Sequence, residues 1–77
     1  MINILFFARL REEAGQESLH VEKAGCTIKE LKEWLDKEYR LSGLNRTMTA
    51  VNEEFTTDDT KVTEGDTIAF IPPVSGG

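Results

Sequence analysis

The chain has 77 residues, a single cysteine and a formal net charge of −5 at pH 7. This length predicts one domain near the lower limit for folding without staples, and one cysteine excludes an intramolecular disulfide. An acidic chain is a poor match for nucleic acid, which binds basic surfaces. No segment reaches the roughly 20 apolar residues that cross a membrane, and the apolar start lacks a signal peptide's basic flank, so we expect a cytoplasmic protein.

The first half of the chain predicts two strands and then a helix. The run from Ile2 to Ala8 is rich in β-branched and aromatic residues and is expected to form a strand. Residues 11–17 are expected to form a loop around Gly15. Residues 18–22 alternate between polar and apolar side chains, which is typical of a half-buried strand.

The clearest helix signal starts at Thr27. Glu30 follows three residues later, which is the capping-box pattern, and Ser42-Gly43 is the expected end of the helix. One face of this helix is apolar, with Trp34 at its rim, and consists of Ile28, Leu31, Leu35 and Tyr39.

The second half of the chain predicts further strands separated by turns. Residues 48–52 and 67–71 are expected to form strands, with turns at residues 52–54 and 63–66. Two strands, one helix and further strands predict an α+β roll, in which the first and last strands pair at the centre of a mixed sheet. This is the β-grasp arrangement of ubiquitin-like proteins. We expect residues 1–71 to form a single domain and residues 72–77 to form an extended tail.

One main helix covers only one face of such a sheet, and side chains on a strand alternate between its faces. We expect the helix to cover Ile4, Phe6, Ile68 and Phe70. The opposite face then keeps Leu5, Phe7 and Ile71, with Phe55 nearby. These residues are either scattered exposed hydrophobes, which are common, or a contiguous docking surface. We favour a docking surface formed by Phe7, Phe55 and Ile71.

The chain ends in "PPVSGG", which is either a frayed terminus or a working group. Pro72 and Pro73 favour a stiff, extended exit from the sheet, and the six tail residues reach roughly 20 Å. Gly76 and Gly77 are narrow enough for a tight tunnel. The Gly77 carboxylate would react with sulfur or amine nucleophiles once another protein had converted it to an acyl-adenylate with ATP. We favour this second interpretation.

Conventional catalysis has few candidate residues. His20 is expected to face solvent on an edge strand, and Cys26 is either a small turn residue or, less simply, a thiol activated by a helix N-terminus. The chain has no glycine-rich phosphate-binding loop and no carboxylate spacing that sets an acid opposite a base. We therefore expect it to be non-catalytic alone and to bind no cofactor or metal by itself. Acidic pairs such as Glu53-Glu54 indicate a solvated surface or a preference for a basic partner.

Three stretches, "FFARLREEAG", "AVNEEF" and "EGDTIAFIPPVSGG", resemble the MoaD-type small subunit of molybdopterin synthase, a ubiquitin-like sulfur carrier. The resemblance covers essentially the whole chain, and the end "PPVSGG" after an apolar strand is its most specific part. It implies that a MoeB-type, E1-like enzyme adenylates Gly77 with ATP. A cysteine-desulfurase or rhodanese-type donor then supplies the sulfur of a thiocarboxylate.

The resemblance also implies a partner and a product. A MoaE-type large subunit would receive the tail, Pro72, Pro73, Val74, Ser75 and Gly76, in its active site. There the sulfur would pass to cyclic pyranopterin monophosphate, with two carriers used for each dithiolene, in a heterotetramer. Phe7, Phe55 and Ile71 would lie on the docking surface of the family.

Three other functions stay open from the sequence. A sulfur carrier of another pathway, such as thiamin-thiazole synthesis, would share the fold and the Gly-Gly end. A ubiquitin-like modifier would be joined to lysine residues of target proteins. A plain interaction module would tolerate the loss of Gly77.

Overall fold

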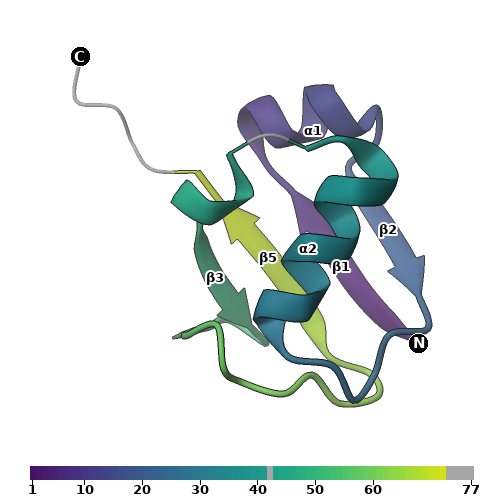
Figure 1. Ribbon diagram of the computed structural model, residues 1–77, viewed down its shortest axis with the longest axis vertical. Coiled ribbons are helices and arrows are strands. Elements are labelled where there is room, and N and C mark those ends of the chain that lie inside the picture. Colours follow the sequence, from purple (N-terminus) through teal and green to yellow (C-terminus); the bar gives the residue numbers. More distant parts are fainter. Residues whose placement is uncertain (42, 73–77) are drawn as a thin grey trace.

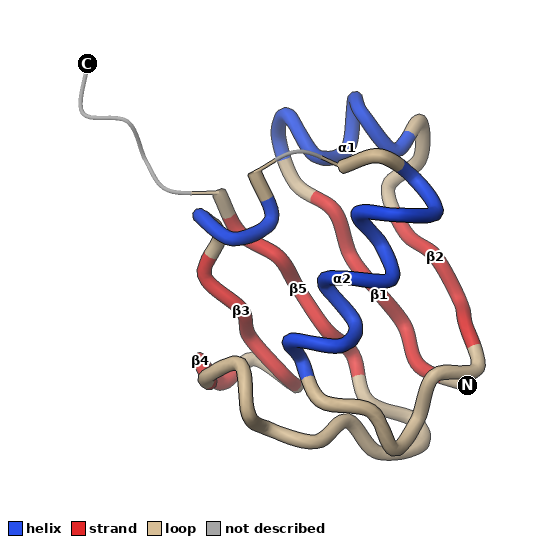
Figure 2. Tube along the Cα trace, in the orientation of Figure 1, coloured by secondary structure: helices blue, strands red, loops and turns tan. Residues whose placement is uncertain are grey.

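The computed structural model describes residues 1–41 and 43–72. Its strands form one five-stranded sheet in the order β2-β1-β5-β3-β4, and α2 crosses one face of that sheet (Figure 1, Figure 2). The elements are β1 (Ile2–Phe6), α1 (Ala8–Ala14), β2 (Ser18–Val21), α2 (Ile28–Tyr39), the 3-10 helix η1 (Leu44–Arg46), β3 (Met48–Val51), β4 (Glu54–Thr56) and β5 (Thr67–Ile71).

The first and last strands are neighbours at the centre of the sheet. β1 and β5 run parallel, and Ile4 and Phe6 lie opposite Ile68 and Phe70 in the register. β2, β3 and β4 extend the sheet on either side through antiparallel pairings. The predicted α+β roll with a mixed β-grasp sheet is confirmed.

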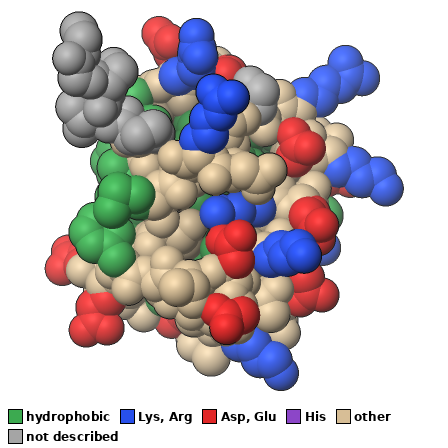
Figure 3. Space-filling model, turned by 60° about the vertical axis from the view of Figure 1, so that its left-hand side comes forward, with side chains coloured by type: hydrophobic (Ala, Val, Ile, Leu, Met, Phe, Trp, Pro, Cys, Tyr) green, Lys and Arg blue, Asp and Glu red, His purple; other side chains and the backbone are tan. Residues whose placement is uncertain are grey.

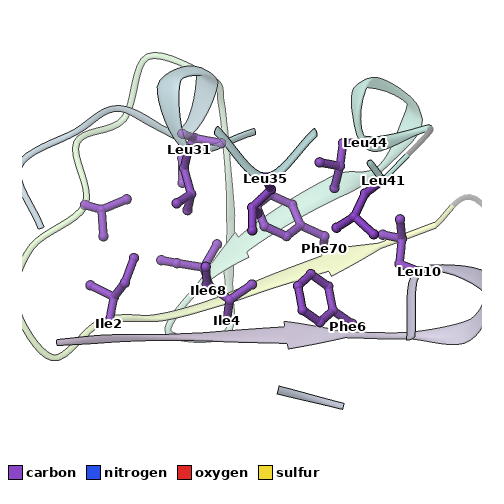
Figure 4. Packing of buried hydrophobic residues seen from close by; sticks show 12 residues of the cluster. Ile2, Ile4, Phe6, Leu10, Leu31, Leu35, Leu41, Leu44, Ile68 and Phe70 are labelled. Carbon is purple, nitrogen blue, oxygen red and sulfur yellow. The ribbon is translucent and has the colours of Figure 1, made fainter. Parts of the chain in front are cut away.

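The core lies between this sheet and α2. Ile4, Phe6, Ile68 and Phe70 are all buried, so the predicted inward face is confirmed. Figure 4 shows that Leu31 and Leu35 of α2 lie over this face. Three leucines outside the sheet and α2 extend the core toward the end of β1 and β5: Leu10, Leu41 and Leu44.

The predicted loop after the first strand is wrong, because Ala8–Ala14 forms helix α1. β1 ends at Phe6 rather than at Ala8, which has a positive φ of 52° and turns the chain. The helix ends at Ala14, and Gly15 follows it in the left-handed conformation with φ 75°, its N–H donating to the Arg11 carbonyl at 3.0 Å. Only Leu10 of this helix is fully buried, so the sequence lacks the periodic apolar pattern of an amphipathic helix. The start of the helix also has no side-chain cap.

α2 begins as predicted and ends earlier than predicted. The Thr27 hydroxyl accepts from the Glu30 N–H, and the Glu30 carboxylate accepts from the Thr27 N–H, so the capping box is confirmed. The helix ends at Tyr39, and Arg40 adopts the left-handed conformation with φ 52° and ψ 44°. The expected end at Ser42-Gly43 is wrong, because Leu41 is drawn into the core; Ser42 lies outside the described residues.

The loop between β4 and β5 is fastened to α2. Lys32 lies in the middle of α2 and is almost fully buried, and its Nζ contacts the Asp58 Oδ1 at 2.8 Å. A bridge between Thr27 and Lys61 holds the same loop near the helix start. None of the helices among the described residues is long and apolar enough to span a membrane.

Candidate functional site

The sheet face opposite α2 carries a row of apolar side chains across four strands. Leu5 of β1 lies opposite Ala69 of β5, Ala69 lies opposite Ala50 of β3, and Ala50 lies opposite Phe55 of β4. Because the two middle residues are alanines and the two outer ones are large, the row is low in its centre and raised at both ends. This arrangement forms a groove whose floor is Ala50 and Ala69.

A second row lies beside the first, nearer the C-terminal end of β5. Ile71 lies opposite Met48 in the register, and Phe7 continues the alternation of β1 with an extended backbone, at φ −125° and ψ 151°. Phe7 therefore projects on the same side as Leu5. Phe7, Phe55 and Ile71, the three predicted docking residues, all line the one groove.

We call the apolar surface formed by these two rows the docking face; it comprises Leu5, Phe7, Met48, Ala50, Phe55, Ala69 and Ile71. Phe7 is 44%, Met48 50% and Phe55 65% exposed, which is unusual for side chains of this size. In Figure 3, apolar side chains gather along one side of the molecule, whereas charged side chains are spread over the rest of the view. Phe7, Met48 and Phe55 thus share one surface, whereas the fourth large exposed apolar side chain, Met1, lies at the opposite end of β1.

Sequence reasoning found the large members of the docking face and missed Met48 and the alanine floor. The signal for Met48 was the alternation of β3, because Met48 and Ala50 are two residues apart and project from the same side. The sequence does not mark Ala50 and Ala69 as the floor of a groove, because small apolar residues are common in strands of any kind.

The other end of this sheet face is polar and tightly hydrogen-bonded. The Asn52 side chain donates to the Asp66 Oδ1 at 2.9 Å and accepts from the Thr67 N–H at 3.0 Å. The Thr63 N–H donates to the other Asp66 oxygen at 2.8 Å. These hydrogen bonds, first from the Thr63 backbone and then from Asn52, hold the pKa of Asp66 below its usual value.

Cys26 and His20 lie away from the docking face. Burial, and then the Glu30 carboxylate, raise the pKa of the Cys26 thiol, so the alternative of a thiol activated by the helix N-terminus is contradicted. His20 is exposed on β2 at the edge of the sheet, as expected. Among residues 1–41 and 43–72, no three His, Cys, Asp or Glu side chains gather as they would around a metal ion.

The chain leaves the sheet beside the docking face. β5 ends at Ile71, a member of the docking face, and Pro72 follows directly and is half-buried. The other tail residues predicted to enter a partner's active site, Pro73, Val74, Ser75 and Gly76, lie outside the described residues, as does Gly77. The docking face is therefore positioned at the base of the predicted tail.

Comparison with known proteins gives end-to-end matches. The model of the ThiS family matches residues 4–77. The molybdopterin synthase sulfur carrier subunit of Haemophilus influenzae is 35% identical over 81 aligned positions that cover 100% of both chains. This chain belongs to the ThiS family, among the molybdopterin synthase sulfur carrier subunits.

Solved structures of similar chains agree with this family and with the fold. A chain from a complex of subunits 1 and 2 of the molybdopterin-converting factor of Helicobacter pylori is 26% identical, with a TM-score of 0.72 and coverage of 99% of this chain and 97% of that chain. SAMP1 from Haloferax volcanii has a TM-score of 0.83 at 24% identity, covering 99% and 98% of the two chains, and supports the β-grasp fold alone.

Proposed function

We propose that this member of the family is the sulfur carrier subunit of molybdopterin synthase in molybdenum cofactor biosynthesis, and that the Gly77 carboxylate carries the sulfur. The observation that supports this most strongly is the match with sulfur carrier subunits over the whole chain, which includes the terminal Gly-Gly. The described part of the chain adds a second support. Its most distinctive surface is apolar and lies where the tail begins.

The proposed chemistry takes place at one carboxylate. A carboxylate oxygen of Gly77 attacks the α-phosphate of ATP on a MoeB-type, E1-like enzyme, and pyrophosphate leaves. The terminal sulfur of a persulfide on a cysteine-desulfurase or rhodanese-type donor then attacks the acyl carbon, and AMP leaves. A thiol cleaves the S–S bond of the resulting acyl disulfide, which releases the thiocarboxylate and leaves the donor cysteine in a disulfide with that thiol. Sulfur then passes to cyclic pyranopterin monophosphate, and hydrolysis returns Gly77 to a carboxylate.

This chain contributes a carrier to that cycle rather than a catalytic centre. The sulfur is bound at the terminus, so neither Cys26 nor His20 takes part. A stiff Pro72-Pro73 exit and a tip of two glycines would deliver the thiocarboxylate into a narrow active site in the partner. ATP is used by the activating enzyme, and we place the cycle in the cytoplasm.

The proposed partner at the docking face is the MoaE-type large subunit. The Helicobacter pylori relative was solved in a complex of subunits 1 and 2, which supports an equivalent pairing here. Phe7, Phe55 and Ile71 would become buried in that contact, because they already line one groove at the base of the tail. Two carriers bound to a dimer of large subunits would make a heterotetramer.

The role of Gly77 is tested by blocking its carboxylate. A chain with one alanine added after Gly77 is compared with the unmodified chain and with Cys26→Ser, each incubated with ATP, the activating enzyme and a sulfur donor. We expect thiocarboxylate on the unmodified chain and on Cys26→Ser, and none on the extended chain. Sulfur on the extended chain, or its loss in Cys26→Ser, would overturn the proposal.

A further inference from the structure

The turn between β3 and β4 holds a glutamate in an unfavourable backbone conformation. Asn52 and Glu53 have positive φ values of 51° and 70°, as in the two central residues of a type I′ hairpin turn. Asn-Gly is the preferred pair for such a turn, because a side chain in the left-handed conformation costs about 1–2 kcal/mol. A glutamate at the second position therefore lowers the stability of the hairpin.

This turn is also rigidly attached to the rest of the sheet. The Asn52 N–H donates to the Thr67 carbonyl at 2.8 Å, in addition to the two side-chain hydrogen bonds that join Asn52 to Asp66 and Thr67. The turn that carries Glu53 is therefore fixed relative to β5, which forms part of the groove floor. A charge at position 53 has a defined place beside the groove.

Among the described residues that line the groove, Glu53 alone is charged. The other lining side chains are apolar or neutral and polar. Glu53 forms no ion pair or side-chain hydrogen bond with any residue that the structure describes. Its neighbour Glu54 is exposed too, but does not line the groove. An unpaired carboxylate beside an apolar surface interacts strongly with an incoming positive charge, since docking would remove water from around it.

We infer that Glu53 determines which partner the docking face accepts, by pairing with a lysine or arginine that the large subunit presents beside an apolar side chain. The apolar side chain would sit on the Ala50–Ala69 floor between Leu5 and Phe55, and the basic group would meet Glu53 at the rim. This inference rests on the proposed function, because it takes the large subunit as the occupant.

Charge also opposes a second copy of this chain as the occupant. Each copy carries a formal net charge of −5, so a contact between two copies through this face would bring two negatively charged chains together. The same negative charge favours a partner with a basic surface and speeds its approach at low ionic strength. A basic partner would therefore both pair with Glu53 at the groove and be attracted by the negative net charge of this chain.

The inference is tested by the affinity of purified full-length variants for the purified large subunit of the same organism. We expect Glu53→Gln to raise Kd about tenfold, as for the loss of a charged hydrogen bond, and to weaken the dependence of Kd on salt. Glu53→Gly should bind as weakly as Glu53→Gln while unfolding at a higher temperature. The matched control Glu54→Gln should change Kd less than twofold.

Equal Kd values for Glu53→Gln, Glu54→Gln and the unmodified chain would overturn the inference. A dimer of this chain that Glu53→Gln dissociates would show that the occupant is a second copy, and would also overturn it. Failure of the proposed function would give a different result. Gly77 would gain no thiocarboxylate, but Glu53→Gln would still weaken binding to the large subunit. If the unmodified chain does not bind the large subunit, the docking role and this inference both fail.

Discussion

Phe6 and Phe7 are adjacent in the chain and project from opposite faces of the sheet, so replacing each with alanine separates folding from docking. Phe6 is 2% exposed and packs in the core, and Phe6→Ala is expected to lower the free energy of unfolding by about 3–5 kcal/mol. For a domain of this size that is a large share of the total stability. Phe7→Ala should lower it by only about 1–2 kcal/mol, because roughly half of its side chain is already in water.

The cost of these changes to docking follows from the exposed fractions. Full burial of a phenylalanine side chain contributes about 1.5–3 kcal/mol. Phe7 is 44% and Phe55 65% exposed, so docking stands to gain about 0.7–1.3 and about 1–2 kcal/mol from them. Alanine substitution should therefore raise the Kd for the large subunit about 3–10-fold at Phe7 and about 5–30-fold at Phe55.

The assay combines urea unfolding with titration calorimetry against the large subunit. Phe7→Ala and Phe55→Ala should remain folded and bind more weakly, and Phe6→Ala should fail to fold stably. Severe unfolding of Phe7→Ala would show that the faces of β1 are assigned backwards. Unchanged Kd values for both Phe7→Ala and Phe55→Ala would show that the docking face does not contact the large subunit.

Two further predictions concern stability. Arg40→Gly should raise the free energy of unfolding by about 0.5–1 kcal/mol, because Arg40 is left-handed at φ 52°. Lys37→Gly, inside α2, should instead lower the free energy of unfolding by about 1 kcal/mol. Equal effects of the two substitutions in thermal unfolding would refute the backbone argument. Because the pKa of Asp66 is lower in the folded chain than in the unfolded chain, its ionised carboxylate stabilises the fold. This stabilisation is fully present at pH values above about 3.9, the pKa of an aspartate in the unfolded chain, and is lost as the pH falls through the pKa of Asp66 in the folded chain. The stability advantage of the unmodified chain over Asp66→Asn, measured by urea unfolding, should therefore shrink between neutral pH and about pH 3, and an advantage that is the same at both would contradict this linkage.

The sheet and α2 could be predicted from the sequence because their signals are periodic. Alternation along residues 2–7 and 67–71 distinguished the covered face from the open one, and the Thr27 capping box fixed the start of α2. α1 escaped prediction because it is a seven-residue helix with one fully buried side chain and no side-chain cap. Its stop signal, Gly15, is equally typical of a loop.

The sequence suggested that the docking face is contiguous but could not establish it. Contiguity depends on the register that places Leu5, Ala69, Ala50 and Phe55 in one row across four strands, and local patterns do not set the register between strands distant in the chain. The end of α2 was missed for a similar reason. The chain leaves the helix at Arg40, and Leu41 then packs in the core. This end of the helix is set by tertiary packing, which local sequence patterns do not reveal.

The central claim is that sulfur is carried on the carboxylate of Gly77, and an intact mass of the chain purified from its native cells tests it most directly. The account predicts a species heavier by the exchange of one oxygen atom for one sulfur atom, with fragmentation that localises the change to Gly77. A terminal carboxylate that stays unmodified, even with ATP, the activating enzyme and a sulfur donor present, would contradict it.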